Sequence, residues 1–383
     1  MPSGHVRKRG ERSWAIIVEL GRDPVTGKRQ RRQWETIRGT KRQAEERLRE
    51  ILAAIKAGTA VEPSHQTTGE FLVSWLEDVV RPNLRLSTIR SYEQVIYLHV
   101  LPLIGSIPLT KLAPQHLQRL YREKTEQGLT HTVRLIHAIL HKALGQAVKW
   151  GLVPRNVADA VERPKIPRKE MRALAPEEAV RLLEAAESDR LHALYVLAVA
   201  CGLRQGELFG LKWEDVDLER GTLTVRRQLQ WLRVNGKTQP VFTEPKSAKS
   251  RRTVALPSVA MTALRRHRVR QAEERLRLGE AWQDYGLVFT TEIGTPLLKG
   301  NFIRRSFKPL LRRAGLPDIP FHSLRHTAAS LLLGAGESLK TVQEMLGHSS
   351  ITLTADIYGH ISLAQQREAA RKMDAILAPA KGN

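Results

Sequence analysis

The stretch Phe-His-Ser-Leu-Arg-His-Thr (321–327) is followed by Leu-Gly-His-Ser-Ser (346–350) and then by Tyr358. Far upstream, Gly-Leu-Arg-Gln-Gly-Glu (202–207) supplies another arginine. Arginine binds phosphate through a planar fork that keeps its proton, and histidine donates or accepts a proton near neutral pH. A tyrosine that attacks a phosphodiester conserves the bond energy in its own ester. These residue types could therefore cut and rejoin DNA without a metal ion.

Taken singly, each residue also has an ordinary interpretation. Arg204 could cap the helix that precedes it, with Glu207 three residues on as its local partner. His348 could end a helix after Gly347, and Tyr358 could be a half-buried aromatic on an amphipathic helix. The individual residues therefore do not decide between structure and catalysis.

A zinc site is a further alternative for the two histidines of the first stretch. His322 and His326 have the His-x-x-x-His spacing of zinc-binding helices. The residue after the first histidine is Ser323, however, and a metalloprotease needs glutamate there. We therefore expect neither a metal nor another cofactor.

Composition points to a nucleic-acid partner. The 383 residues contain 62 Lys and Arg against 39 Asp and Glu, a formal charge of +23. Such an excess favours a polyanion as binding partner, although a merely solubilising surface is the alternative.

The single cysteine, Cys201, lies in an apolar run, which predicts a buried, inert thiol. With no apolar stretch long enough to span a bilayer, we expect no membrane partner and a cytoplasmic, nucleoid-associated protein in a bacterial host.

Residues 1–60 have the pattern of a small basic module. The pattern predicts two strands, at 13–20 and 28–36, on either side of an Asp-Pro-Val-Thr-Gly turn. It also predicts a helix over 41–57, capped by Thr40. A cationic ribbon with a helix could enter a DNA groove. The candidate DNA-binding residues of this ribbon are Arg29, Arg31 and Arg32.

Residues 66–163 are predicted to form a helical domain. Helical spacing of apolar residues supports helices over 89–99, with Ser87 or Thr88 as cap, over 114–127, and up to Trp150. Two prolines then break the basic segment 162–172, which reads as a linker that could cross a phosphate backbone. Its candidate DNA-binding residues are Lys165, Arg168 and Lys169.

The remainder is predicted to be mostly helical with a small strand-rich patch. Strands are expected at 221–226, 239–243 and 252–256, the last two flanking a basic segment. Helices are expected near 258–278, 300–314, 322–334, 338–346 and 350–358. The whole chain is thus predicted to be mainly α with small β elements, an α+β fold.

The combination of motifs resembles the tyrosine recombinases of the phage-integrase type. The matching stretches are Cys-Gly-Leu-Arg (201–204) with Glu207, His-Ser-Leu-Arg-His-Thr (322–327), Leu-Gly-His-Ser (346–349) and Tyr358, in the order typical of that family. The resemblance implies an arm-type DNA-binding module at 1–60, a SAM-like core-binding domain at 66–163 and a catalytic domain at 173–360. The tail, 361–383, would pack either on a neighbouring protomer or on its own domain.

The resemblance also implies a role for each matching residue. Arg204 and Arg325 would clamp the scissile phosphate, and Tyr358 would attack it to form a 3′-phosphotyrosyl link. His322 would assist proton transfer, and His348 would hydrogen-bond a non-bridging oxygen. Glu207 would support Arg204.

A lysine on a β-hairpin serves as general acid in that family. Lys246 fits best here, because it precedes Ser247 where the family usually has Lys-Thr; Lys249 is the alternative. Cys201 and Ser323 replace a usual threonine and a frequent aspartate, and neither change removes a reacting group.

The implied function is site-specific DNA recombination that integrates or excises a mobile element. The expected partners are double-stranded attachment sites and three further copies of the chain in a homotetramer. An accessory DNA-bending or directionality protein is a further candidate partner. A DNA-relaxing topoisomerase and a non-catalytic DNA-binding regulator are the alternatives.

Overall fold

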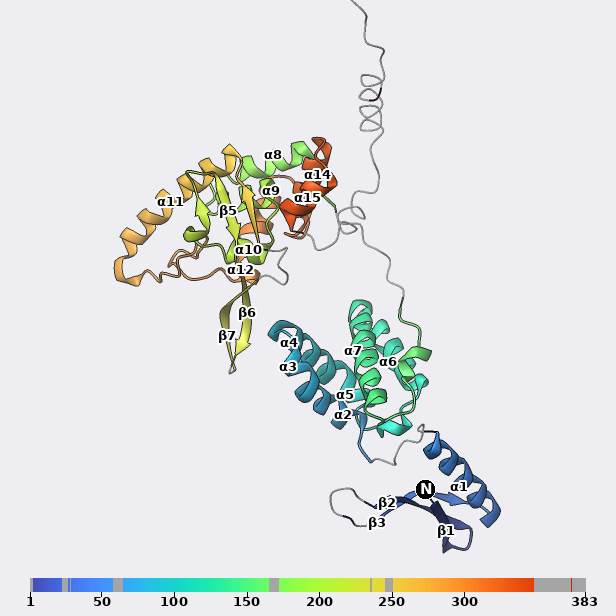
Figure 1. The fold of residues 1–383 in the computed structure, drawn as a ribbon. Helices are drawn as coiled ribbons and strands as arrows, with labels where there is room; N and C mark the ends of the chain where they lie inside the picture. Colours follow the sequence, from blue (N-terminus) through green and yellow to red (C-terminus); the bar gives the residue numbers. More distant parts are fainter. Residues whose placement is uncertain are drawn as a thin grey trace, which may run out of the picture. The chain divides into compact units, whose positions relative to one another are not determined.

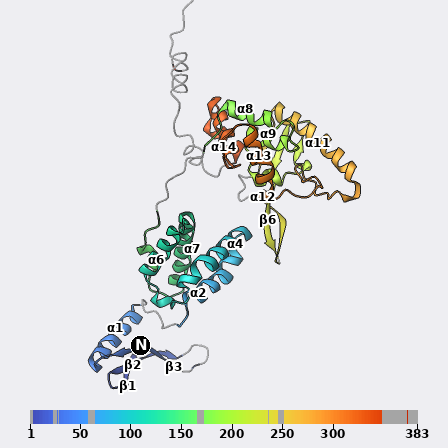
Figure 2. The same cartoon turned by 180° about the vertical axis from the view of Figure 1, so that it is seen from behind.

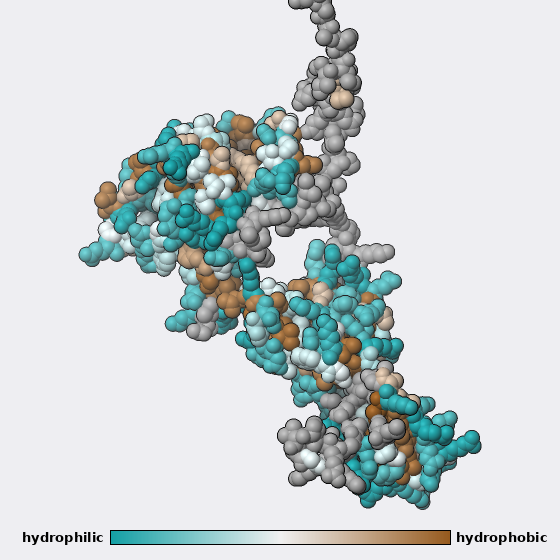
Figure 3. Space-filling view, in the orientation of Figure 1, coloured by the Kyte–Doolittle hydropathy of each residue, from teal (hydrophilic) through white to brown (hydrophobic). Residues whose placement is uncertain are grey.

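A computed structural model describes residues 3–22, 27, 29–57, 65–164, 172–234, 236–244, 251–347 and 373. The chain divides into two compact units, residues 1–168 and 169–383. Figures 1 and 2 show the elements from opposite sides. On the face visible in Figure 3, hydrophilic side chains cover most of the surface of each unit, as expected for units with separate buried cores.

The first unit begins with a three-stranded antiparallel sheet in the order β1-β2-β3. Its strands are β1 (Ser3–Gly10), β2 (Ser13–Arg22) and β3 (Arg29–Arg38), and α1 (Lys41–Lys56) follows. Thr40 and Gln43 close a capping box at the start of α1. Ile16 and Val18 of the sheet pack against Leu48 and Ile51 of the helix. The first strand, β1, was not expected from the sequence.

Residues 65–164 form a helical bundle with its own core. Its α-helices are α2 (Thr68–Trp75), α3 (Arg81–Asn83), α4 (Leu86–Val95), α5 (Leu101–Ile104), α6 (Pro114–Glu126) and α7 (Thr130–Lys149). The π-helices η1 (Leu76–Val80) and η2 (Ile96–Val100) join neighbouring α-helices, and η3 (Leu109–Lys111) and η4 (Val157–Ala160) are 3₁₀ turns. The fully buried Trp75 and Tyr121 belong to this core. The expected cap at Ser87 or Thr88 is wrong, because α4 already begins at Leu86.

The second unit contains two small sheets. One has the order β4-β5-β8, built from β4 (Val216–Asp217), β5 (Thr222–Val225) and β8 (Arg252–Ala255). The other pairs β6 (Gln228–Val234) with β7 (Lys237–Thr243), and this ribbon projects from the rest of the unit in both views (Figures 1 and 2).

The other regular elements of the second unit are helices. They are α8 (Pro176–Ala185), α9 (His192–Ala200), α10 (Gln205–Phe209), α11 (Ser258–Leu278), α12 (Lys299–Phe302), α13 (Lys308–Arg313), α14 (Ser323–Gly334) and α15 (Leu339–Leu346); the short turns are η5 (Trp213–Asp215), η7 (Gly279–Ala281) and the π-helix η8 (Ile303–Phe307). The apolar α9 is almost wholly buried and forms the centre of the core together with Phe289, Phe307 and Leu324. The expected helix at 350–358 lies outside the described residues.

The expected α+β fold is confirmed, with helices dominating and small sheets inserted. The prediction of a buried thiol is also confirmed: Cys201 is inaccessible, and burial raises its pKa to about 12. In the part of the chain that the structure describes, no helix combines the length and apolar character needed to cross a bilayer.

Candidate active site

Arg204 is placed by a sharp turn at the end of α9. Gly202 has a φ of +60°, a left-handed conformation that favours glycine, and a Cβ there would meet a Leu346 side-chain atom at 2.3 Å. The turn brings Arg204 to the N-cap position of α10. Its guanidinium donates to Glu207 Oε1 at 2.8 Å and to the Gly347 carbonyl oxygen at 2.9 Å, while a third of the side chain stays exposed.

Arg325 approaches the same place from α14. It is 2% exposed, and its guanidinium donates to the carbonyl oxygens of Gly202 at 2.7 Å and Leu346 at 2.5 Å. Both arginines therefore hold the end of α15. These contacts join residues that are 123 and 143 positions apart in the sequence: Arg325 lies near Gly202, and Arg204 lies near Gly347.

His322 precedes α14 and lines a cavity of about 580 Å³ together with Arg204. The other lining residues are Gln205, Gly206, Phe209, Gln228, Leu229, Gln230, Trp231, Leu232, Leu298 and Lys299. The charged groups in this set are cationic, with no carboxylate among them. Desolvation and the charges of His326, Arg325, Arg204 and Lys299 lower the pKa of His322 to about 4. The cavity is therefore suited to an anion.

Glu207 contacts Arg204, which lines this cavity, and is itself only 5% exposed. It accepts hydrogen bonds from the backbone N–H of Arg204 at 2.9 Å and from Arg252, whose Nη2 lies 2.9 Å from Oε2. Burial by itself raises the pKa of Glu207, but the hydrogen bonds and charges of Arg252 and Arg204 outweigh it and leave that pKa below its usual value. Glu207 is therefore a buried carboxylate between two guanidinium groups.

Several candidate catalytic residues lie outside the described residues: Lys246 with its alternative Lys249, His348 and Tyr358. The last described residue of this region, Gly347, follows α15 in a left-handed conformation. The hairpin implied for Lys246 lies outside the described residues. In the part that the structure describes, the flanking strands are not paired with each other: β7 pairs with β6, and β8 pairs with β5.

The candidate DNA-binding residues are only partly described. Arg31 and Arg32 are exposed on β3, and Arg31 Nε lies 2.8 Å from Glu19 Oε1. The Arg29 side chain, Lys165, Arg168 and Lys169 lie outside the described residues.

The two histidines considered for zinc lie together, with ring centroids 5.0 Å apart in an edge-to-face arrangement. Within the described ranges, no group of three His, Cys, Asp or Glu side chains is arranged to hold a metal ion. Sequence reasoning missed two cations near the site, Arg252 and Lys299. Neither lies in a motif with His322 or Arg325, although Arg252 belongs to the basic segment that contains the candidate lysines.

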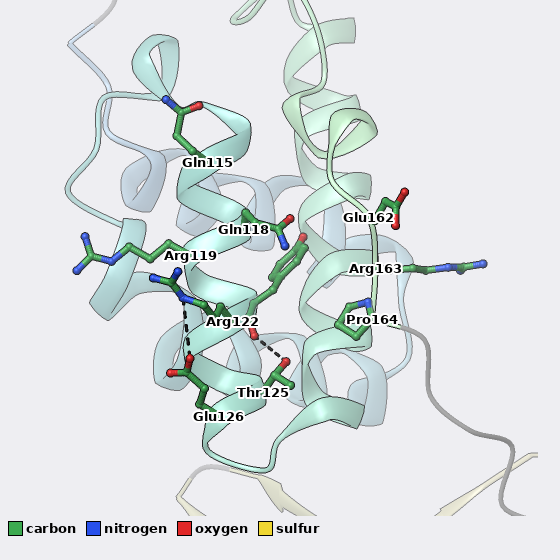
Figure 4. Close-up of a pocket in the computed structure, with 10 residues that line it drawn as sticks. Gln115, Gln118, Arg119, Arg122, Thr125, Glu126, Glu162, Arg163 and Pro164 are labelled. Atoms are coloured by element: carbon green, nitrogen blue, oxygen red, sulfur yellow. Dashed lines mark hydrogen bonds and ion pairs between the residues drawn. The ribbon is translucent and has the colours of Figure 1, made fainter.

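A second, wider cavity of about 950 Å³ lies beside α6 in the helical bundle (Figure 4). Its arginines are accompanied by carboxylates: Arg122 lies 4.0 Å from Glu126, and Arg163 adjoins Glu162 in sequence. The buried Tyr121 hydroxyl already has a partner, His137 Nδ1, at 3.1 Å. This cavity lacks the purely cationic lining found beside Arg204.

Two protein-family models match this chain. The model of the phage integrase family matches residues 172–365, and the model of the phage integrase N-terminal SAM-like domain matches residues 67–125. The chain belongs to the phage integrase family. It is therefore a tyrosine-type site-specific DNA recombinase, as the resemblance implied.

Relatives of this phage integrase family member match it over almost its whole length. A tyrosine recombinase XerC-like protein of Caldanaerobacter subterraneus is 34% identical over 96% of this chain and 97% of its own. The ICEBs1 integrase of Bacillus subtilis is 29% identical over 97% of this chain and 100% of its own.

Solved integrase structures share the fold. The Tn1549 transposon integrase, bound to a circular intermediate DNA, superposes with a TM-score of 0.67 at 21% identity, covering 80% of this chain and 99% of that one. A lambda integrase tetramer bound to a Holliday junction gives a TM-score of 0.57 at 20% identity, covering 94% and 97%.

The low pKa of His322, about 4, predicts that DNA binding depends on pH. A phosphate bound beside Arg204 and His322 would favour the protonated imidazole and would raise its pKa. The complex then binds more protons than the free protein, so DNA affinity should increase as the pH falls from about 7 to about 5.

Fluorescence anisotropy with a core-site duplex, repeated at several pH values, measures how the DNA affinity changes with pH. We expect a shallower pH dependence for His322→Gln than for the unaltered chain. His192→Gln, at the start of α9 in the same unit, is the control. Equal slopes for all three proteins would contradict the assignment of His322 to the phosphate site.

Proposed function

We propose that this protein is the integrase of a mobile element, which cuts and rejoins DNA at attachment sites through a 3′-phosphotyrosyl intermediate. The observation that carries the proposal is the convergence of Arg204 and Arg325 on the end of α15, beside a cavity whose charged groups are cations. The names of the relatives, a transposon integrase and the ICEBs1 integrase among them, support the mobile element.

The reaction needs a nucleophile, neutralisation of the phosphate and an acid for the leaving oxygen. Tyr358 Oη loses its proton and bonds to phosphorus while the bond from phosphorus to O5′ breaks. His322, neutral at pH 7, is suited to accept the proton from the tyrosine. Lys246 donates a proton to O5′, which leaves as a hydroxyl; Lys249 is the alternative donor.

The phosphate clamp stabilises the charge that develops between these two steps. Arg204 and Arg325 donate to the non-bridging oxygens, and His348 adds a hydrogen bond. Because the phosphotyrosyl ester retains the energy of the broken bond, the 5′ hydroxyl of another strand can attack it and restore a DNA linkage. No nucleotide triphosphate is required.

The other parts of the chain serve to bind the DNA and to assemble the protomers on it. We assign residues 1–60 to arm-type DNA binding, 66–163 to core-site binding, 173–360 to catalysis and 361–383 to a tail that packs on its own or a neighbouring protomer. The SAM-like family match within 67–125 supports the second assignment. A homotetramer on two duplexes fits the lambda integrase tetramer, and an accessory directionality protein would set the choice between integration and excision.

Trapping covalent adducts tests this function. The protein is incubated with fragmented DNA of a host and of its resident elements, denatured, and recovered with any DNA linked to it. Sequencing the linked ends should return one or a few recurrent positions at element boundaries. Adducts at random positions would instead support a relaxing topoisomerase, and no adduct would support a non-catalytic regulator.

The same experiment includes a chain that begins after residue 60. This truncation should retain adduct formation on short core-site DNA but lose affinity for long DNA with distal sites. Unchanged affinity for the long DNA would exclude the arm-binding assignment.

A further inference from the structure

Three arginines donate to three successive carbonyl oxygens at the end of α15. Arg252 Nε lies 2.7 Å from the Met345 oxygen, Arg325 Nη2 2.5 Å from Leu346, and Arg204 Nη2 2.9 Å from Gly347. The last carbonyls of a helix lack intrahelical partners and carry the negative end of its dipole, so cationic donors satisfy them well. The end of α15 is therefore fixed by guanidinium groups from three separate elements.

Arg252 differs from Arg204 in exposure. Its side chain is 6% exposed, against 33% for Arg204, and it does not line the cavity that contains Arg204 and His322. Arg325 is as buried and likewise does not line the cavity, but its motif assigns it to the phosphate, whereas Arg252 belongs to no such motif. The contacts of Arg252 point instead to an effect on the reaction through its neighbours.

Glu207 is the first of these neighbours. Arg252 Nη1 lies 3.2 Å from Glu207 Oε1, and Arg252 Nη2 lies 2.9 Å from Oε2. The same two oxygens accept from Arg204, Oε1 from the guanidinium and Oε2 from the backbone N–H. Arg252 thus fixes both oxygens of the carboxylate that orients Arg204.

Gly347 is the second neighbour. A Cβ on this residue would lie 3.0 Å from Arg252 Cδ and Nη1, so the backbone passes directly over the guanidinium. Gly347 has a φ of +66°, a conformation that favours glycine. The next residue in the chain is His348, the candidate ligand of a non-bridging oxygen.

We propose that Arg252 is a positioning residue for strand cleavage. It fixes the position of Glu207, and through Glu207 that of Arg204, relative to the end of α15. The segment with His348 and Tyr358 follows this end of α15 in the sequence. Arg252 is also the first residue of β8 and follows the segment that contains Lys246. One buried guanidinium therefore contacts both the carboxylate beside Arg204 and the end of α15, after which His348 and Tyr358 follow in the sequence. This inference rests on the proposed cleavage function.

The test compares two substrates that differ at the scissile phosphate. One is a phosphodiester, and the other is a methylphosphonate, in which a methyl group replaces one charged non-bridging oxygen and reduces the need for an arginine clamp. On the phosphodiester, Arg252→Gln should lower the single-turnover rate of adduct formation about a hundredfold, as misplaced catalytic groups do. On the methylphosphonate its effect should be about tenfold smaller, because the group displaced by the substitution, Arg204, matters less there.

Arg190→Gln is the matched control. Arg190 is a partly buried arginine of this unit, with its side chain 21% exposed. Its Nε lies 2.7 Å from Glu274 Oε1 and its Nη1 2.6 Å from the Thr290 carbonyl oxygen, and it contacts none of the residues around Arg204 described above. A general loss of stability should lower the rates on both substrates by the same factor. Thermal unfolding and DNA affinity of both variants are measured alongside.

Each outcome decides a different point. If Arg252→Gln lowered the rate of adduct formation by the same factor on both substrates, or did not lower it at all, the positioning role would be overturned. Absence of adducts from the unaltered chain on the phosphodiester would instead overturn the proposed function. If Arg252→Gln does not fold, Arg252→Lys replaces it, since lysine keeps the charge but cannot bind both Glu207 oxygens and the Met345 oxygen together. The same comparison of substrates then applies.

Discussion

Replacing Tyr358 by phenylalanine should abolish covalent adduct formation while leaving DNA binding intact. The substitution removes only the hydroxyl that we propose attacks phosphorus, and no other group of the clamp can form the same ester. We expect the adduct on a nicked suicide substrate to fall by at least about a thousandfold. Denaturing gel electrophoresis with labelled DNA measures the adduct, and a mobility shift measures binding.

Tyr285→Phe is the matched control, because Tyr285 is an exposed tyrosine of the same unit at 39% exposure. It should form adducts as the unaltered chain does. Adducts that persist in Tyr358→Phe would identify a different nucleophile, which peptide mapping of the linked residue would then locate.

Replacing Arg325 by lysine should have the second largest effect, because this residue has both a structural and a catalytic task. Lysine keeps the charge but loses the planar fork that reaches the Gly202 and Leu346 oxygens together. A buried carbonyl left without its donor lowers the free energy of unfolding by about 1–3 kcal/mol. Loss of one clamping donor should lower the single-turnover cleavage rate by about a hundredfold to a thousandfold.

The two contributions can be separated by measurement. Thermal denaturation reports the stability, and cleavage is measured well below the unfolding midpoint, where the variant remains folded. Arg190→Lys, which alters another arginine bonded to backbone carbonyls, should lose stability but little activity. Equal activity losses in the two variants would contradict a direct contact between Arg325 and the phosphate.

Much of the fold follows from local sequence signals. Helices α1, α6, α7 and α11 could be placed because caps, prolines and apolar spacing mark them clearly. The pairing of β6 with β7 could not, since it depends on register across a turn and on contacts with distant residues, such as the hydrogen bond from Trp231 to Leu297. The strands that flank the segment around Lys246 were therefore predicted without their partners, β6 for β7 and β5 for β8.

The candidate site could likewise be predicted only in part from the sequence. The motifs identified Arg204, His322 and Arg325 because family resemblance assigns them by type and order. Arg252 carried no such signal: it lies 45 positions from Glu207, and only the pairing of β8 with β5 brings it beneath the clamp. Its charge is also common in a basic chain, so composition could not distinguish it from the exposed arginines around it.

The separation of the apolar cores has a consequence for how such a chain can evolve. Ile16, Trp75 and Phe289 belong to three apolar clusters that share no residue. Selection can therefore remodel the surfaces that we propose address DNA without repacking the interior that fixes the arginines. Exchange of whole modules between related elements likewise leaves each interior complete. A lineage can acquire a new chromosomal target while inheriting its chemistry unchanged.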